Sequence, residues 1–320
     1  MTEQVIESPL EGIVASSDKW GRSSWSNQPS SKVAHHILET RLQAVWRYLP
    51  LAAEKSDEDV EHVHQLRIAT RRAVEALRVF SGLIPDAEWQ DMRTKLRKIR
   101  LAADQARNWD VLADMFLNGS EVSCGGIVSK ILEEVKGRRR EVQQPIVEIY
   151  QGLVAENFDE QIGALLREVC SQHHGRGKRT FGREARRHLK AVLKRFIKAS
   201  DADWSDDDAL HHLRICTKKL RYTMEMIAVA FEPSFRKRLY PQISKLQDLM
   251  GIVNDHAMGK AFFHDWSQKA QDAQEKAFFE GLVFAEARAH RDVRQAFLVI
   301  WTPKTVAKLC RQFRKYCCLP

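Results

Sequence analysis

A nine-residue segment occurs twice in this chain, and the repetition constrains the fold more than any other feature. The sequence HQLRIATRR at residues 64–72 returns as HHLRICTKK at residues 211–219, an offset of 147 residues. Residues of the same type continue to match without gaps from about residue 33 to residue 110, for example Lys98 with Lys245. Solenoid repeats are only about 20–50 residues long. We therefore expect two copies of one multi-helix unit, packed about a pseudo-twofold axis.

Both copies show the periodicity of α-helices. From Val33 onward apolar residues recur about every 3.6 residues, and strand-like alternation is absent. The 15 Gly and 9 Pro residues are too few for a turn-rich β fold. We predict an all-α fold. The predicted helices are 32–53, 58–82, 86–118, 127–151, 154–171, 179–200, 206–231, 234–265, 269–299 and 304–317.

The pattern also suggests where the chain divides. Residues 1–31 are rich in Ser, Gln and Pro without a sustained period, which predicts a flexible leader. The glycines around residues 173–177 predict a hinge between a first half, 32–172, and a second half, 173–320. Ser-Asp pairs at 56–57 and 205–206 predict the N-terminal caps of the helices that carry the repeat.

Several functional classes find no support in the sequence. The six cysteines form no Cys-x-x-Cys pair, so a zinc ribbon and a redox motif are both disfavoured. A secretory signal is not visible, and no apolar run approaches the roughly 20 residues that span a bilayer. We expect a reduced, cytoplasmic protein with no membrane insertion, no cofactor and no metal.

The charge of the chain is unevenly distributed. The formal net charge is +9, but residues 1–31 hold four acidic and two basic residues, for a net −2. Residues 32–320 therefore carry 49 basic and 38 acidic residues, for a net +11. Such a surplus indicates a polyanionic partner, which could be nucleic acid, a phosphate polymer or an anionic membrane. The alternative is a soluble protein that is basic without a dedicated anionic partner.

The repeated helices each place their cations on one face. At about 100° per residue, His64, Arg67, Arg71 and Arg78 share a face opposite the apolar residues. In the second copy His211, Arg214, Lys218, Arg221 and Tyr222 share the corresponding face, and Tyr222 is a weak stacking candidate. A cationic row is costly unless an anion occupies it, although Glu75 should relieve the first row and Glu225 the second. The competing interpretations are a solvated amphipathic face and, for the histidines, core positions.

Two further basic rows are not shared between the copies. One row lies in the helix after the hinge, at Arg183, Arg187, Lys190, Lys194 and Lys198. The other lies in the third helix of the first half, at Arg93, Arg97, Arg100 and Arg107. A twofold-like assembly would allow all these rows to surround one cleft. Because few aromatic residues accompany the cations, we expect a base-free polyanion, or nucleic acid bound without sequence preference.

Catalysis and metal binding are poorly supported. The chain has no Gly-rich phosphate loop before a helix, no Gly-x-Ser-x-Gly and no acidic cluster suited to Mg²⁺. The repeat has no His pair at i and i+4, the spacing typical of helical zinc sites. We therefore predict a non-enzymatic binding protein. A metal-dependent polyphosphate or nucleotide hydrolase and a scaffold for an acidic protein remain as alternatives.

The paired motifs resemble the CHAD domain family (conserved histidine α-helical domain). The resemblance covers about residues 32–300 and includes KIR at 98–100, RNWDV at 107–111 and KLQDLMGIVND at 245–255. It implies two pseudo-symmetric four-helix bundles whose basic surfaces meet at a central groove or pore. It also implies binding of inorganic polyphosphate, with location on polyphosphate granules and granule-associated proteins as partners. Asp104 and Asn108 depart from the family pattern, which usually has Gly and Asp there.

The resemblance and the basic rows together define the predicted binding set. The positions that match the family motif are His64, Arg67, Arg71, Arg72, His211, Arg214, Lys218, Lys219, Arg221 and Tyr222. The basic rows and the second motif add Arg78, Arg93, Arg97, Arg100, Arg107, Arg183, Arg187, Lys190, Lys194 and Lys245.

Overall fold

The computed structural model describes residues 25–119, 125–171, 179–204 and 206–317. Within these ranges the chain is helical and forms no strand, so the prediction of an all-α fold is confirmed. The long helices are α2 (Ser30–Glu54), α3 (Glu61–Val79), α4 (Asp86–Gly119), α5 (Gly125–Ala155), α6 (Phe158–Ser171), α7 (Phe181–Ser200), α8 (Asp207–Ile227), α9 (Tyr240–Lys269), α10 (Ala273–Ile300) and α11 (Pro303–Cys317). Short helices lie at Ser81–Leu83, Ala228–Ala230 and Phe235–Leu239.

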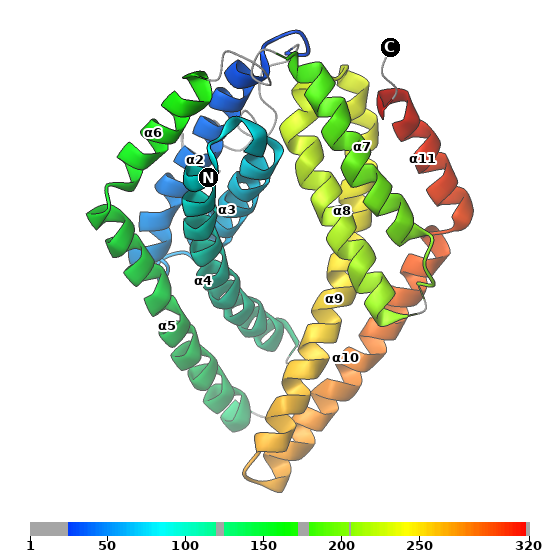
Figure 1. The fold of residues 1–320 in the computed structure, drawn as a ribbon. Coiled ribbons are helices and arrows are strands. Elements are labelled where there is room, and N and C mark those ends of the chain that lie inside the picture. The colour runs from blue at the N-terminus through cyan, green and yellow to red at the C-terminus, as the bar shows by residue number, and fades with distance from the viewer. Residues whose placement is uncertain (1–24, 120–124, 172–178, 205, 318–320) are drawn as a thin grey trace, which may run out of the picture.

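The helices form two groups that lie side by side (Figure 1). In the first group α2 packs against α3, α5 and α6, and α4 packs against α3 and α5. In the second group α8 packs against α7 and α9, α9 and α10 form a long hairpin, and α11 covers α7. The two helices that carry the repeat, α3 and α8, pack against each other across the two groups. The duplication itself and the pseudo-twofold relationship stay predictions.

The apolar face of each repeated helix forms part of one core that extends through both groups. Leu66 and Leu77 of α3 are almost fully buried, as are Leu213 and Leu220 of α8. Burying one such side chain stabilises the fold by roughly 1.5–3 kcal/mol. The opposite faces of α3 and α8 are therefore the ones left to carry charge.

The segment before α2 connects the two groups. The Trp25 amide donates to the Val229 carbonyl at 3.1 Å, and the Gly182 amide donates to the Ser26 carbonyl at 2.8 Å. A Cβ atom at Gly182 would collide with the Ser26 hydroxyl and lie 3.1 Å from the Ser26 carbonyl oxygen, so glycine favours the close approach of these segments. Helix α2 begins at Ser30, so the predicted boundary at residue 31 lies inside ordered structure, and residues 1–24 lie outside the described residues.

A second, smaller apolar cluster joins the two groups at the far end of α9 and α10 (Figure 1). Ile131 and Val135 of α5 pack there with Phe263 of α9 and Phe279 of α10. Lys130 lies 3.7 Å from Glu275 in the same region. The two groups are thus held together at two places, and α3, α4, α8 and α9 face one another between them.

The predicted helix boundaries are mostly within a few residues of the observed ones. Asp206 caps α8 as predicted, because its side chain accepts a hydrogen bond from the Ala209 amide at 3.0 Å. The cap predicted at residues 56–57 is wrong. Helix α3 begins later, and the Asp59 side chain accepts from the Glu61 amide at 2.8 Å. The predicted hinge at residues 173–177 lies outside the described residues.

None of the described helices combines the length and the apolar character needed to cross a membrane.

Candidate anion-binding site

The packing of α3 against α8 brings cations from both halves of the chain together. Burial and the charges of Arg71, Arg214 and Arg67 lower the pKa of Lys218 to about 7. Burial also lowers the pKa of Arg214, and Arg71 and Arg67 contribute to that shift. These four side chains, Arg67, Arg71, Arg214 and Lys218, are therefore close enough to repel one another. We call them the central cluster.

Asp255 of α9 lies near enough to Arg214 to act on its pKa, and a second carboxylate, Asp104 of α4, lies directly against the central cluster. Its Oδ1 accepts from Arg67 Nε at 2.8 Å and from Arg71 Nη2 at 2.7 Å. Burial works to raise the pKa of Asp104, but Arg71 and Arg67 outweigh it and lower the pKa, so the carboxylate stays charged. In the sequence Asp104 stands out only as a departure from the family pattern. The structure shows that it is the internal counterion of the first-half cations.

His64 lies at the edge of the central cluster. Burial lowers its pKa, and the charges of Arg107, Arg67 and Arg71 act in the same direction. His64 is therefore neutral at neutral pH. Its Nδ1 is buried without a hydrogen-bond partner among the described residues. The residue that titrates near neutral pH in this site is Lys218, which the sequence did not suggest.

Helix α4 extends the positive surface beside the cluster. Arg100 is half-buried one turn before Asp104, and its Nε has no hydrogen-bond partner in the described part of the chain. Arg107 lies near enough to His64 to affect its pKa. Arg93 and Arg97 are exposed farther along α4, where the Arg93 guanidinium lies 5.2 Å from the Trp89 ring centroid.

Two of the predicted site residues hold the halves together instead. Arg72 Nε donates to Glu225 Oε2 of α8 at 2.9 Å, and the Tyr240 hydroxyl donates to Glu225 Oε1 at 2.6 Å. Arg78 Nε donates to Glu75 at 2.9 Å, and Arg78 Nη2 donates to Thr223 of α8 at 2.9 Å. Glu225 thus pairs with Arg72 of α3 across the junction. It also acts on the second row as expected: burial works to lower the pKa of Arg221, but Tyr222, Tyr240 and Glu225 raise it.

The remaining predicted site residues of α8 and α9 do not lie on one common surface. Tyr222 is only 7% exposed, and the Arg221 guanidinium lies 4.9 Å from its ring centroid. Tyr222 is thus unavailable for stacking on a base, which corrects the suggestion made from the sequence. His211 and Lys245 are exposed. Lys219 lies on the side of α8 that faces away from Arg214 and Lys218, beside α7.

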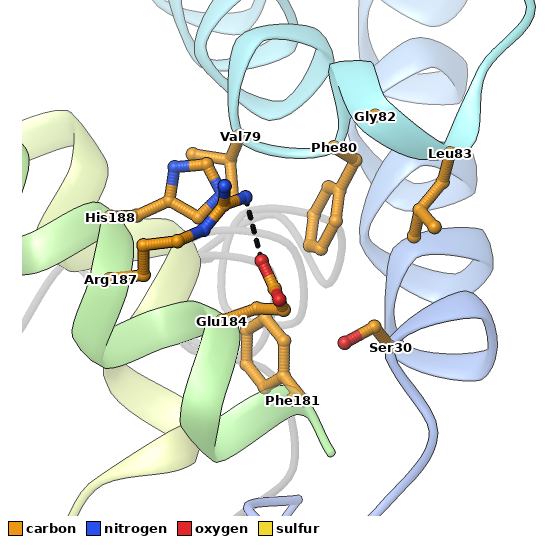
Figure 2. Close-up of a pocket in the computed structure, with 9 residues that line it drawn as sticks. All are labelled: Ser30, Val79, Phe80, Gly82, Leu83, Phe181, Glu184, Arg187 and His188. Carbon is orange, nitrogen blue, oxygen red and sulfur yellow. Dashed lines mark ion pairs between the residues drawn. The ribbon is translucent and has the colours of Figure 1, made fainter. Parts of the chain in front are cut away.

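The row on α7 begins at the junction between the halves. Figure 2 shows Arg187 paired with Glu184, with Nη2 and Oε2 2.7 Å apart, in a pocket that also contains Phe80 and His188. The volume of this pocket is about 20 Å³, close to the space needed by a single water molecule. Burial together with Arg187 and Arg78 lowers the pKa of His188 to about 4. This pocket belongs to the packing of the junction, whereas Arg183, Lys190 and Lys194 are exposed farther out.

The side chains of the central cluster are suited to binding phosphate oxygens. The described residues contain no group of three or more His, Cys, Asp or Glu side chains that could hold a metal ion. The central cluster instead combines Arg guanidinium groups, which form paired hydrogen bonds to phosphate oxygens, with the point charge of Lys218.

Comparisons with known proteins agree with this fold. A family model described as "CHAD domain" matches residues 36–264. The crystal structure of the CHAD domain from the plant Ricinus communis is similar, with 21% sequence identity and a TM-score of 0.66 over 87% of this chain and 96% of that chain. PptA from Streptomyces chartreusis is similar over 86% of this chain and 99% of that chain, with 15% identity and a TM-score of 0.58. At these identities the structural likeness shows the fold alone. No curated protein matches the sequence.

Proposed function

Since this chain belongs to the CHAD domain family, we propose that it binds inorganic polyphosphate without enzymatic turnover, through the central cluster and the basic rows beside it. The observation that carries the proposal is the meeting of Arg67 and Arg71 with Arg214 and Lys218 in one partly buried site. Four basic side chains with two nearby carboxylates, Asp104 and Asp255, leave an excess of positive charge in this site. Repulsion in such a site is strong, and a bound polyanion would relieve it.

The character of the surface favours a base-free polymer over nucleic acid. Proteins that bind single strands without sequence preference usually add aromatic side chains on which bases stack. Tyr222, the aromatic residue on the basic face of α8, is buried beneath Arg221. A polyphosphate chain needs only closely spaced cations, and Arg100 and Arg107 extend the central cluster along α4.

We also propose how the chain is organised and where the protein lies in the cell. Residues 32–172 and 173–320 would be the two halves of one CHAD module, with the polymer bound between them. Both halves contribute to the central cluster, so neither half would bind well alone. In cells the protein would lie in the cytoplasm on polyphosphate granules, together with granule-associated proteins. A fluorescent fusion that stays diffuse in granule-containing cells would contradict this placement.

Neutralising one cation from each half tests the proposed site. We expect the double variant R71Q/R214Q to bind long-chain polyphosphate on the order of a hundredfold more weakly than the parent protein, measured by fluorescence anisotropy at fixed salt. The dependence of log affinity on log salt should become shallower by about 0.7 for each phosphate that the variant no longer neutralises. The matched control is K136Q/R140Q, which removes two exposed cations from α5. Equally weakened binding in the two variants would place the binding site elsewhere.

Competition separates the proposal from its alternatives. If duplex or single-stranded nucleic acid displaces long-chain polyphosphate at equal phosphate concentration, the protein is a nonspecific nucleic-acid binder instead. If polyphosphate incubated with the protein and Mg²⁺ or Mn²⁺ releases orthophosphate, and H64A abolishes that release, the protein is a hydrolase. Circular dichroism of every variant checks that its helices remain intact.

A further inference from the structure

A hollow of about 290 Å³ lies between α7 and α8 on the outer side of α8. Its volume is near the lower end of the range for small-molecule pockets. His212, Cys216 and Lys219 line it. At about 100° per residue, Cys216 lies about 160° around the helix from Arg214 and Lys218, and Lys219 lies about 100° from Lys218. The hollow is therefore separate from the central cluster. Its full lining is Val192, Arg195, Lys198, His212, Ile215, Cys216 and Lys219.

The rim of the hollow is positive and lacks an internal counterion. Arg195, Lys198 and Lys219 contribute three cations, and no Asp or Glu belongs to the lining. Within the ranges that the structure describes, none of the three forms an ion pair with a carboxylate. The central cluster, by contrast, has Asp104. Three unpaired cations around one hollow favour an anion in it.

The floor of the hollow is uncharged. The Cys216 side chain is 6% exposed, and its Sγ lies 3.7 Å from His212 Nε2. Burial raises the pKa of the Cys216 thiol, even though Lys219 and Arg195 act in the opposite direction. The thiol is therefore neutral at neutral pH and does not balance the cations. His212 is exposed at the same place and can donate a hydrogen bond to a ligand.

The positive rim is a property of the second half alone. At the offset of 147 residues the counterparts of Arg195, Lys198 and His212 are Tyr48, Leu51 and Gln65. The counterpart of Lys219 is Arg72, which is paired with Glu225. The repeat therefore does not account for the charge of the hollow.

We propose that the α7–α8 hollow is a second anion site that binds a compact condensed phosphate through Arg195, Lys198, His212 and Lys219. The phosphate could arrive as a free short chain or as the end of a long polymer, and both present the same chemistry. The site does not depend on polyphosphate binding at the central cluster.

Inorganic pyrophosphate is the probe for this site. Histidine NMR of the full chain follows the His212 ring, whose signal is assigned by its disappearance in H212Q. We expect saturating pyrophosphate to shift that signal. By calorimetry, R195Q/K219Q should bind pyrophosphate at least tenfold more weakly. The matched control K136Q/R140Q, which removes the same charge from exposed positions of α5 outside both proposed sites, should retain both the affinity and the shift.

Long-chain polyphosphate in the same measurement identifies the source of the ligand. A shift of the His212 signal with the long chain means that the polymer reaches the hollow, and a shift with pyrophosphate alone means that free short chains occupy it. The charge-conserving variant R195K/K219R should bind like the parent protein, which separates loss of charge from loss of fold. An unmoved His212 signal with pyrophosphate, or undiminished affinity in a folded R195Q/K219Q, would overturn the proposal. Failure of the central site alone would leave these results unchanged.

Discussion

Lys218 should make polyphosphate binding pH-dependent above neutrality. In the free protein burial and the charges of Arg71, Arg214 and Arg67 lower its pKa to about 7. A bound polyanion favours the charged ammonium, so the pKa of Lys218 rises in the complex. Below pH 7 the side chain is protonated in both states and affinity does not depend on this group. Above pH 7 the free protein must take up a proton in order to bind, and affinity falls as pH rises.

The size of the effect follows from the uptake of one proton by Lys218 when polyphosphate binds. Affinity should fall by up to tenfold for each pH unit, which corresponds to about 1.4 kcal/mol. With a free-state pKa of about 7, and with Lys218 protonated over this range in the complex, the loss between pH 7.5 and pH 9 is about 25-fold. At pH 8 binding should take up about 0.9 proton, because roughly that fraction of free Lys218 is neutral. The lowered pKa of His64 keeps its imidazole neutral over the whole range.

The assay is calorimetry with long-chain polyphosphate in buffers of different ionisation enthalpy, which reports proton uptake directly. The control is K218R, because a guanidinium stays charged over this range and should give tight binding without the added pH dependence. K218M should bind more weakly at pH 7 and also lose the dependence. The difference in pH dependence between the parent protein and K218R reports Lys218 alone, because the chain terminus and the other titrating groups are the same in both proteins. Equal pH dependence in these two proteins would refute the reasoning.

Three further predictions concern single residues. D104N removes the counterion of Arg67 and Arg71, so we expect on the order of tenfold tighter polyphosphate binding by anisotropy and a lower unfolding temperature without ligand. Unchanged affinity would contradict that role of Asp104. E225A removes the buried carboxylate that accepts hydrogen bonds from Arg72 and Tyr240 at the junction, so the free energy of unfolding in urea should fall by about 3–5 kcal/mol. A decrease below about 1 kcal/mol would show that Glu225 does not hold the halves together. G182A should cost about 1–3 kcal/mol of stability through its collision with Ser26, and a second substitution, S26G, should recover part of that stability.

Residue spacing along the chain was enough to predict the helices and to separate their apolar faces from their cationic faces. Helix formation and the 3.6-residue period are short-range properties, so the apolar stripe through Leu213 and Leu220 and the opposite cationic stripe could be found from residue spacing. The cap at Asp206 was predictable for the same reason, because a cap involves neighbours along the chain. The pattern of the repeat also identified the family, which the family model confirms over residues 36–264.

How the charged side chains pair with one another depends on the packing of the helices. Asp104 meets Arg67 and Arg71 because α4 packs against α3, and Glu225 meets Arg72 because α8 does. Such pairs depend on the distance between groups that are 33 to 153 positions apart in the chain. Charge interactions vary with distance and with the exclusion of water, and packing sets both. The lowered pKa of Lys218, the burial of Tyr222 and the hollow between α7 and α8 have the same origin.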